Sequence, residues 1–394
     1  MFSARTNWPK ELNPLATALK QRRGQGLPIV DLTESNPTAA GFEYPGGAML
    51  EALAQPAAMR YEPSPRGLHA ARAAIAGYYA ATGVRADAEH IVVTSGTSEA
   101  YSHAMRLLAN PGDEILCPSP SYPLFDFLAD INDVKLVHYP LIYDHGWRID
   151  LDCLHGLITD RCRAVLVVNP NNPTGSYLRR EELAALIEMA RSSSLALVVD
   201  EVFRDYAWDF ESSVAPDRVG TTAAIDSCLT LTLNGLSKLA ALPQMKLGWM
   251  IVSGPADIAE DALERLDIIA DTYLSVSTPV QHAVGKWIKQ GALVRGQILE
   301  RIRENLAVLD SKTAHGAGVN RLAAEGGWYA ILRLPNVCSG EEWAMELLQA
   351  DGVYVHPGHF FGLPNQGYLV VSLLPEPKRF REGIDKLLAR VSER

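Results

Sequence analysis

The sequence predicts an α/β fold: a large domain around a mostly parallel sheet sandwiched by helices, and a smaller α+β domain. One observation is length, because 394 residues exceed the size at which a single hydrophobic core keeps growing. Another is that short runs, apolar along their whole length, alternate with helix-like segments, as in a parallel sheet buried on both faces. The pattern changes toward the C-terminus. We therefore expect an N-terminal arm and part of the small domain in 1–44, the large domain in 45–285 and the small C-terminal domain in 286–394.

The predicted elements follow in chain order. An arm and a short basic helix end near residue 26, and a short strand follows at 28–32. The proline-punctuated loop YEPSPRG precedes a helix over 68–83. Strands are predicted at 90–94, 114–117, 163–168, 195–199, 228–233 and 247–252, with helices after Gly96 and over 180–191. A long helix at 279–309 precedes the C-terminal part, where we expect strands at 327–334, 353–356 and 368–373, and helices at 341–349 and from 378.

Composition excludes several classes of protein. The net charge of −10 argues against sequence-independent nucleic-acid binding, which needs clustered Lys and Arg. Five scattered cysteines without CxxC spacing indicate reduced thiols in a cytosolic protein and no zinc site. No apolar run approaches the ~20 residues of a membrane span, and the start lacks the apolar segment of a signal peptide. The sequence therefore predicts a cytoplasmic protein without a metal.

A lysine stands directly after the strand predicted at 228–233 and its Asn234-Gly235 turn. Open α/β sheets bind their ligands at the carboxyl ends of the strands, where Ser237-Lys238 would lie. Lysine forms Schiff bases once it loses its proton, which burial or a neighbouring cation promotes. Taken alone, a lysine after a turn is more often a surface charge. A second cation, Lys246, follows eight residues later.

Other polar residues follow neighbouring strands. Gly96, Thr97 and Ser98 open a helix whose free N–H groups and two hydroxyls could hold a phosphate. The alternative for this turn is an ordinary helix N-cap. Asn172 lies in NPNNPTG, where its amide could meet a phenolate-like oxygen or only stabilise a turn.

Two more residues complete the set. Asp200 ends a strand as a carboxylate able to pair with a protonated ring nitrogen, or it caps a helix. Tyr122 offers an aromatic face for stacking, or packs in the core. The alternatives lose weight jointly, because phosphate cradle, stacking ring, amide, carboxylate and lysine occur in one chain in one order.

These motifs resemble those of the fold-type I, class I/II aminotransferases, which use pyridoxal 5'-phosphate. The matching pieces are TSGTSEA, PSY, NPNNPTG, DEVF, SK with its downstream cation, EGGWYAILRLP and HPGHFFG. The resemblance covers nearly the whole chain, and NPNNPTG with DEVF and SK at these spacings is its most specific part.

The resemblance implies a role for each residue. Lys238 would form the internal aldimine and later shuttle a proton, while Asp200 would keep the pyridine nitrogen protonated. The cofactor's phosphate, ring and O3' would be held by Gly96, Thr97, Ser98, Tyr122, Asn172, Ser237 and Lys246. Tyr61 resembles a tyrosine that reaches the phosphate of the neighbouring subunit, which implies a homodimer with active sites at the interface.

Three positions depart from the family pattern. Phe203 replaces a tyrosine that would donate to O3', which predicts a higher aldimine pKa than in relatives with tyrosine. Lys246 replaces an arginine, keeping the charge but losing the bidentate fork. Val370 stands where relatives place the arginine that clamps the substrate α-carboxylate.

The substrate site is therefore the least determined part of the sequence. Candidates for it are Asn36, Arg66, Arg333 and His359. For either arginine the alternative is an ordinary surface residue, and for His359 a hydrogen-bonded loop histidine.

The sequence predicts a pyridoxal-phosphate-dependent aminotransferase that moves an amino group from an amino acid to a 2-oxo acid by a ping-pong mechanism. One alternative is a lyase or decarboxylase on the same scaffold, for which the missing carboxylate arginine leaves room. Another is a non-catalytic relative with a regulatory or assembly role, against which an intact Lys238, Asp200 and Asn172 argue.

Overall fold

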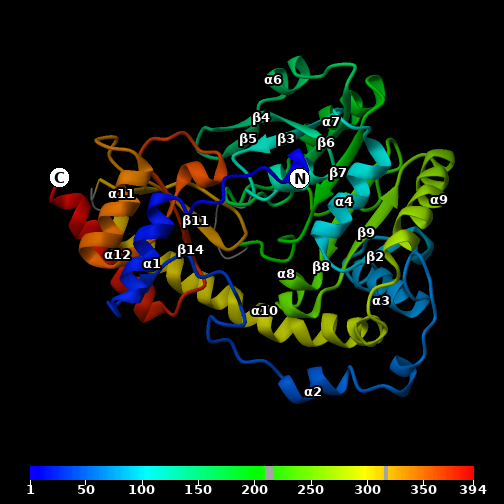
Figure 1. The fold of residues 1–394 in the computed structure, drawn as a ribbon, viewed down its shortest axis with the longest axis horizontal. Helices are drawn as coiled ribbons and strands as arrows, with labels where there is room; N and C mark the ends of the chain where they lie inside the picture. The colour runs from blue at the N-terminus through cyan, green and yellow to red at the C-terminus, as the bar shows by residue number, and fades with distance from the viewer. Residues whose placement is uncertain (209–216, 315–317) are drawn as a thin grey trace.

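The computed structural model describes residues 1–208, 217–314 and 318–394. Its centre is an eight-stranded sheet in the order β2-β9-β8-β7-β6-β3-β4-β5 (Figure 1). In that order the strands are β2 (Ile91–Thr94), β9 (Gly248–Ser253), β8 (Thr230–Gly235), β7 (Ala196–Asp200), β6 (Cys162–Val168), β3 (Glu114–Ser119), β4 (Lys135–Tyr143) and β5 (Trp147–Ile149). The predicted α/β class with a mostly parallel central sheet is confirmed.

Strand β9 reverses the direction of the sheet. It pairs antiparallel with both β8 and β2, whereas β8, β7, β6, β3 and β4 are parallel to one another. The amino end of β9 therefore meets the carboxyl ends of the parallel strands. Lys246, two residues before β9, lies at the same sheet edge as the turns after β2, β7 and β8.

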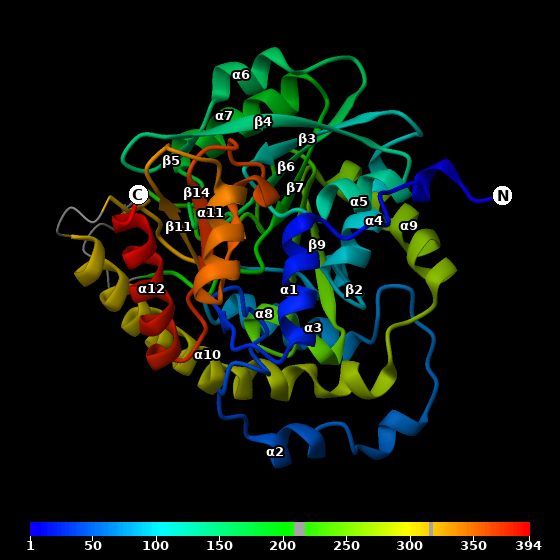
Figure 2. The same cartoon turned by 60° about the vertical axis from the view of Figure 1, so that its left-hand side comes forward.

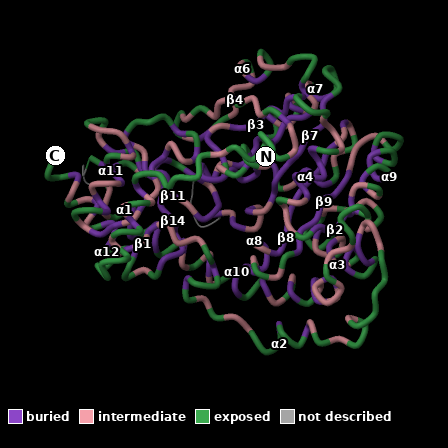
Figure 3. Tube along the Cα trace, viewed as in Figure 1, coloured by how far each residue is buried: buried purple, intermediate pink, exposed green. Residues whose placement is uncertain are grey.

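Helices cover both faces of this sheet, and its central strands β2, β9, β8, β7, β6 and β3 are mostly buried (Figure 3). One face packs against α4 (Thr97–Leu108), α5 (Phe125–Ile131) and α9 (Ala256–Tyr273). The other packs against α6 (Leu151–Gly156) and α7 (Arg180–Ser192) at one end, and against α3 (His69–Ala80), α8 (Leu236–Leu239) and α10 (Thr278–Thr313) at the other. Burial on both faces explains why the central strands are apolar along their whole length.

A second, antiparallel sheet has the order β10-β11-β14-β13, formed by β10 (Asn320–Arg321), β11 (Tyr329–Arg333), β14 (Tyr368–Ser372) and β13 (His356–Pro357). Helices α1 (Pro14–Gly24), α11 (Gly340–Glu346) and α12 (Pro377–Ser392) lie with it (Figures 1 and 2). The N-terminal β1 (Val30–Asp31) pairs with β12 (Val353–Tyr354), so the start of the chain belongs with its end. Helix α10 spans the distance between the two sheets (Figure 1).

The structure differs from the predicted elements in several places. Strands β4 and β5 and helices α5, α6 and α9 had not been predicted. The helix expected at 341–349 ends at Glu346 and continues as a π-helical turn, Leu347–Asp351. The proposed domain boundary between 285 and 286 falls inside α10, which runs through it unbroken. The three domain ranges therefore stay a prediction.

The N-terminal arm crosses onto α5 before α1 begins (Figure 2). The Trp8 indole donates to Asp130 at 2.7 Å and packs edge-on against Phe127 at 5.2 Å. Arg5 pairs with Asp133 at 3.2 Å. The arm is therefore fixed to the helix that directly follows the Tyr122 loop.

The sequence predicts neither a membrane span nor a metal site, and the structure can be compared with these two expectations only over the described residues. Among the described residues, no helix is long and apolar enough to cross a membrane. The same residues contain no group of three or more His, Cys, Asp or Glu side chains placed to hold a metal ion. All five cysteines are free thiols.

Candidate active site

Lys238 lies in the short helix α8, directly after β8. Its carbonyl accepts a hydrogen bond from the Tyr206 hydroxyl at 2.7 Å, and Leu236 N–H donates to Leu247 O at 3.0 Å. Burial lowers the pKa of Lys238 to about 8, while the negative charge of Asp200 acts in the opposite direction. The unprotonated amine, which a Schiff-base nucleophile requires, is therefore far more accessible near neutral pH than for an ordinary lysine.

Asp200 is the buried carboxylate that faces this amine. It ends β7, and its two oxygens accept from the Tyr101 hydroxyl at 2.7 Å and from Val202 N–H at 2.9 Å. Burial raises the pKa of Asp200, and these two donors with the Lys238 charge counteract the rise. A buried carboxylate that is only partly compensated favours a cationic partner.

The loop 169–175 carries three asparagines with different surroundings. Asn169 bonds to Leu178 N–H and Val219 O, and Asn171 accepts from the Thr174 hydroxyl at 2.9 Å. Asn172 is equally buried, but its side-chain oxygen has no hydrogen-bond partner among the described residues. Buried amide groups are normally paired, so Asn172 is the asparagine of this loop that has capacity for a ligand.

The start of α4 forms the anion-binding end of the site. Thr97 and Ser98 are the first two residues of the helix, where backbone N–H groups have no acceptor within the helix, whereas the Glu99 N–H donates to Gly96 O at 3.1 Å. A Cβ on Gly248 would lie 3.0 Å from Thr97 N and 2.9 Å from the Gly96 carbonyl carbon. Strand β9 thus lies directly against this turn. The exposed Lys246 lies two residues before β9 and has a left-handed backbone conformation with φ +52°. A helix start beside a cation suits a phosphate.

Tyr122 and His359 line one cavity of about 240 Å³. Its wall also contains Phe125, Phe360 and Phe361, and Ser121 N–H donates to Phe361 O at 2.8 Å. The structure therefore brings the predicted stacking ring and the predicted substrate histidine together. The Nδ1 atom of His359 is buried, without a partner in the described part of the chain.

Four other predicted residues lie apart from Lys238 or have other partners. Arg66 forms a two-pronged pair with Asp267, with both distances 2.6 Å, and also donates to Glu89 O. Because Glu89 precedes β2 and Gly96 follows it, this guanidinium points toward the opposite end of the strand. Arg333 is exposed and ends strand β11. It lies four residues, or about 13 Å, from Tyr329 at the start of that strand.

The remaining two are on the surface of the single chain. Asn36 is exposed and accepts from the amide and hydroxyl of Thr38, as in a local turn. Tyr61 is 68% exposed. Ser237 is half-buried beside Lys238.

Val370 is fully buried in an apolar cluster. Its neighbours there include Trp147, Ile331, Phe361 and Leu363. A cation at this position in β14 would have to be accommodated among these side chains, and the described members of the cluster are all apolar. Val370 itself therefore offers no cation to a substrate carboxylate, and the residue paired with it across the sheet in β13 is His356.

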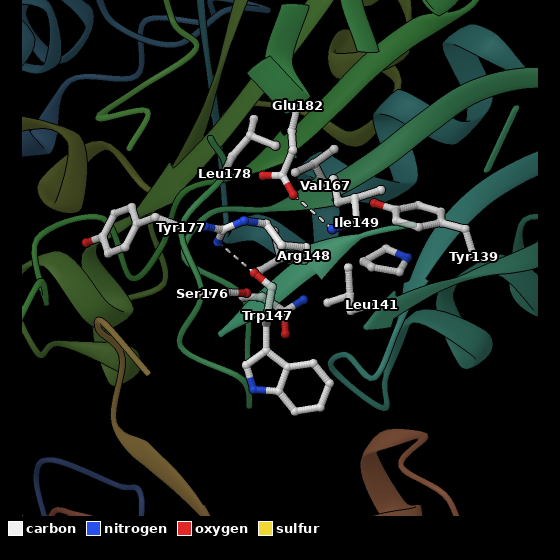
Figure 4. Close-up of a pocket in the computed structure, with 13 residues that line it drawn as sticks. Tyr139, Leu141, Trp147, Arg148, Ile149, Val167, Ser176, Tyr177, Leu178 and Glu182 are labelled. Atoms are coloured by element: carbon white, nitrogen blue, oxygen red, sulfur yellow. Dashed lines mark hydrogen bonds between the residues drawn. The ribbon is translucent and has the colours of Figure 1, made fainter. Parts of the chain in front are cut away.

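A second, smaller cavity lies behind the loop 169–175 (Figure 4). It measures about 20 Å³, room for about one water molecule. Glu182 in its wall accepts from Ile149 N–H at 2.9 Å and from Arg179 N–H at 2.7 Å. This carboxylate fixes α7 against the β5 strand and is not free for a ligand.

Three residues of the site had not been singled out from the sequence: Tyr101, Tyr206 and Trp328. Tyr101 and Tyr206 act through single hydroxyl bonds to Asp200 and to the Lys238 carbonyl. Trp328 had appeared only inside the motif EGGWYAILRLP. The amine of Lys238 lies 4.8 Å from the centre of its indole ring.

A buried lysine and carboxylate, an anion-binding helix start and an aromatic pocket at one sheet edge define an enzyme of amino-group chemistry. The chain belongs to the family "Aminotransferase class I and II", whose sequence profile matches residues 28–387. The protein is an aminotransferase that transfers amino groups between amino acids and 2-oxo acids by a ping-pong mechanism.

Named relatives and solved structures agree with this assignment. Glutamate-pyruvate aminotransferase AlaA of Haemophilus influenzae is 30% identical over 386 residues, covering 94% of this chain and 92% of that protein. The crystal structure of an aminotransferase from Escherichia coli superposes with a TM-score of 0.84 at 28% identity, covering 100% of this chain and 98% of that one. Alanine aminotransferase from Pyrococcus furiosus has a TM-score of 0.89 at 23% identity over the full length of both chains, a likeness of fold.

Proposed function

We propose that pyridoxal 5'-phosphate is the cofactor of this aminotransferase and that Lys238 is its covalent attachment point. The observation that carries the proposal is the desolvated amine of the half-buried Lys238, which interacts with the charge of the buried Asp200 carboxylate. The amide oxygen of Asn172, unpartnered among the described residues, indicates space in the site for a further polar group. The residues present therefore fit this cofactor, which when bound supplies an electron sink for charge on the substrate carbon.

Each residue then has a defined task. Asp200, held by Tyr101 and Val202, carries the negative charge that pairs with a protonated ring nitrogen. Asn172 orients the ring through its side-chain amide, and Tyr122 covers one ring face. The phosphate is bound by Gly96, Thr97, Ser98, Ser237 and Lys246. Lys238 moves a proton at its Nζ once it is released from the cofactor.

The active enzyme is a cytoplasmic homodimer in this proposal. Three large apolar side chains in 46–61 are exposed in the single chain: Leu50 by 63%, Met59 by 90% and Tyr61 by 68%. Exposed apolar residues gathered on one segment favour a protein interface. Tyr61 would then reach the phosphate site of the neighbouring subunit.

Alanine, glutamate, pyruvate and 2-oxoglutarate are the first substrates to test, because the relatives at about 30% identity are named for alanine and glutamate–pyruvate transfer. Val370 gives a reason to include amines that lack a carboxylate. Because Val370 is an apolar side chain within an apolar cluster, this position in β14 offers no guanidinium to a substrate carboxylate.

The test is the visible spectrum of the purified enzyme during addition of each amino donor. We expect a cofactor band that changes with a donor and returns with a 2-oxo acid. Lys238→Ala should lose the covalently bound form, whereas Lys289→Ala, at an exposed position of the α10 helix, should not. A wild-type protein without a cofactor band would overturn the proposal, and a response to carboxylate-free amines alone would redirect the substrate assignment.

A further inference from the structure

Three aromatic rings form a cluster beside Lys238, and two of them lie close to its amine. Phe203 and Tyr206 follow β7, and Trp328 directly precedes β11. Their rings meet edge to face, with centroids 5.2 Å apart for Phe203 and Trp328, 5.0 Å for Tyr206 and Trp328, and 6.2 Å for Phe203 and Tyr206. All three are buried. The amine lies 4.8 Å from the Trp328 centroid and 5.6 Å from that of Phe203.

The backbone that carries Trp328 is held by hydrogen bonds to two other segments of the chain. Leu373 N–H donates to Trp328 O at 2.8 Å, and Gly327 N–H donates to Tyr206 O at 2.9 Å. The Trp208 indole donates to Gly327 O at 3.0 Å. The segment before β11 is thereby tied to the segment after β7. The indole itself is held by edge-to-face packing against Phe203 and Tyr206, while its Nε1–H has no partner among the described residues.

The polar groups described around α8 are occupied elsewhere and leave the amine without a hydrogen bond. The Tyr206 hydroxyl is used by the Lys238 carbonyl, and the Tyr44 hydroxyl by Ala241 O. Arg295 on α10 donates to Leu239 O and lies 3.9 Å from Asp205. Lys246 is exposed beyond the short helix Pro243–Met245. Asp200 acts on the amine through charge alone, because no hydrogen bond or ion pair joins them among the described residues.

We propose that Trp328 is a positioning residue that binds the protonated amine of Lys238 through a cation–π contact on its indole face. An ammonium in a buried site needs a compensating group, and the indole is the strongest aromatic partner for it. Trp328 supplies a direct contact with a negatively polarised surface, whereas Asp200 acts on the amine through its charge without a hydrogen bond among the described residues. It thereby holds Nζ in place when the amine carries the proton that it moves. The inference rests on the proposed role of Lys238 as the reactive amine.

The expected effect is on the protonation midpoint of Lys238 in the cofactor-free protein. The rate at which a small amine-directed reagent labels Lys238 would be measured against pH by peptide mass spectrometry, with the exposed Lys246 as reference within the same protein. Trp328→Leu should lower the Lys238 midpoint by about one pKa unit, because the ammonium loses its partner. In Trp328→Phe, whose ring attracts a cation less strongly than an indole, the Lys238 midpoint should lie between those of the wild type and Trp328→Leu. The Lys246 midpoint should not move.

Fluorinated tryptophans separate electrostatics from packing. Each fluorine withdraws charge from the indole face at almost constant shape, so the Lys238 midpoint should fall stepwise with fluorine number. In the Trp328→Phe background the other tryptophans are still replaced, and the midpoint should no longer depend on fluorination. If Trp328→Leu fails to fold, the fluorinated series still tests the cation–π contact.

The two outcomes are distinct. An unchanged Lys238 midpoint across the fluorine series would overturn the cation–π role, even if Trp328→Leu lowers thermal stability, since a packing role alone would do that. A wild-type protein that binds pyridoxal 5'-phosphate without modification of Lys238 would instead contradict the proposed function.

Discussion

The chemistry of this site depends on two buried side chains of opposite charge. Burial lowers the pKa of Lys238 to about 8 and raises that of Asp200. Each ionised form then depends on few partners: for Asp200 the Tyr101 hydroxyl and Val202 N–H, and for Lys238 the Asp200 charge and the Trp328 face. Removing one such partner should change the protonation of Lys238 or Asp200, or the affinity for the cofactor, more than it changes the fold.

The first prediction concerns the ring at position 203. Phe203→Tyr returns a phenol donor beside the expected cofactor oxygen, and a donor to an ionised oxygen stabilises its unprotonated form. The pH midpoint of the visible cofactor band should therefore fall, by about one pKa unit. Spectrophotometric titration measures it. Phe203→Leu removes the ring without adding a donor and should not lower the midpoint; the same midpoint in Phe203→Tyr and wild type would count against the idea.

The second prediction concerns the donor to Asp200. Tyr101→Phe removes one hydrogen bond to a buried carboxylate, a loss of about 1.5–3 kcal/mol. Ionisation of Asp200 then becomes less favourable, which weakens its pairing with the cofactor. The dissociation constant of the cofactor, measured by equilibrium titration, should therefore rise about 10-fold or more. Tyr139→Phe, which removes another buried tyrosine hydroxyl that donates to Leu166 O at 2.8 Å, is the control. Equal losses in both variants would indicate only a general effect of losing a buried hydroxyl.

Among the secondary-structure elements, the sequence predicted strand positions better than strand directions. The run at 247–252 is apolar like its neighbours because β9 is buried on both faces, and this pattern is the same whichever way a strand runs. The position of Lys246 at the ligand edge depends on that reversal. Strands β4 and β5 escaped prediction because most of their residues are only partly buried, so neither a continuous apolar run nor a clean alternation marks them.

The site residues divide in the same way. Asp200 ends strand β7, Lys238 lies in the short helix directly after β8, and Asn172 lies in the loop after β6, so motif and position together single them out as candidates. Tyr101 and Trp328 reach the site from a helix interior and from the start of a distant strand. Their roles depend on contacts between segments more than 80 residues apart, such as the 99-residue separation of Tyr101 and Asp200. No local pattern carries that information.

The third prediction concerns how the asparagine loop is held. Gly175 has φ +66°, and a Cβ there would lie 2.4 Å from Gly326 O and 2.9 Å from the Ala324 side chain. Gly175→Ala should destabilise the protein by at least about 1 kcal/mol and displace Asn172, which weakens cofactor binding. Thermal unfolding and cofactor titration measure the two effects. Gly146→Ala, where a Cβ would meet nothing within 4 Å, is the matched control.

At the scale of the whole molecule, the two sheets and the two chain ends form one assembly around the site. Trp328 and the His359 turn come from the C-terminal part, while Lys238, Asp200 and Asn172 come from the central sheet. The N-terminal strand β1 pairs with β12, and the arm before α1 reaches α5. The segment that carries Tyr61 instead exposes its large apolar side chains, which a second subunit would cover.

The last prediction tests that subunit directly by mixing two impaired variants. Lys238→Ala lacks the attachment point, and Tyr61→Phe lacks the hydroxyl expected to reach the phosphate of the neighbour. In a mixed dimer, one site has Lys238 from one chain and Tyr61 from the other, so it is fully wild type, while the second site has neither. Dissociation and reassociation of the two variants should thus restore a population of sites with wild-type cofactor affinity and activity. If Tyr61 instead acted within its own chain, every site with Lys238 would carry the Tyr61→Phe change, and the mixture would show only the impaired affinity of that variant.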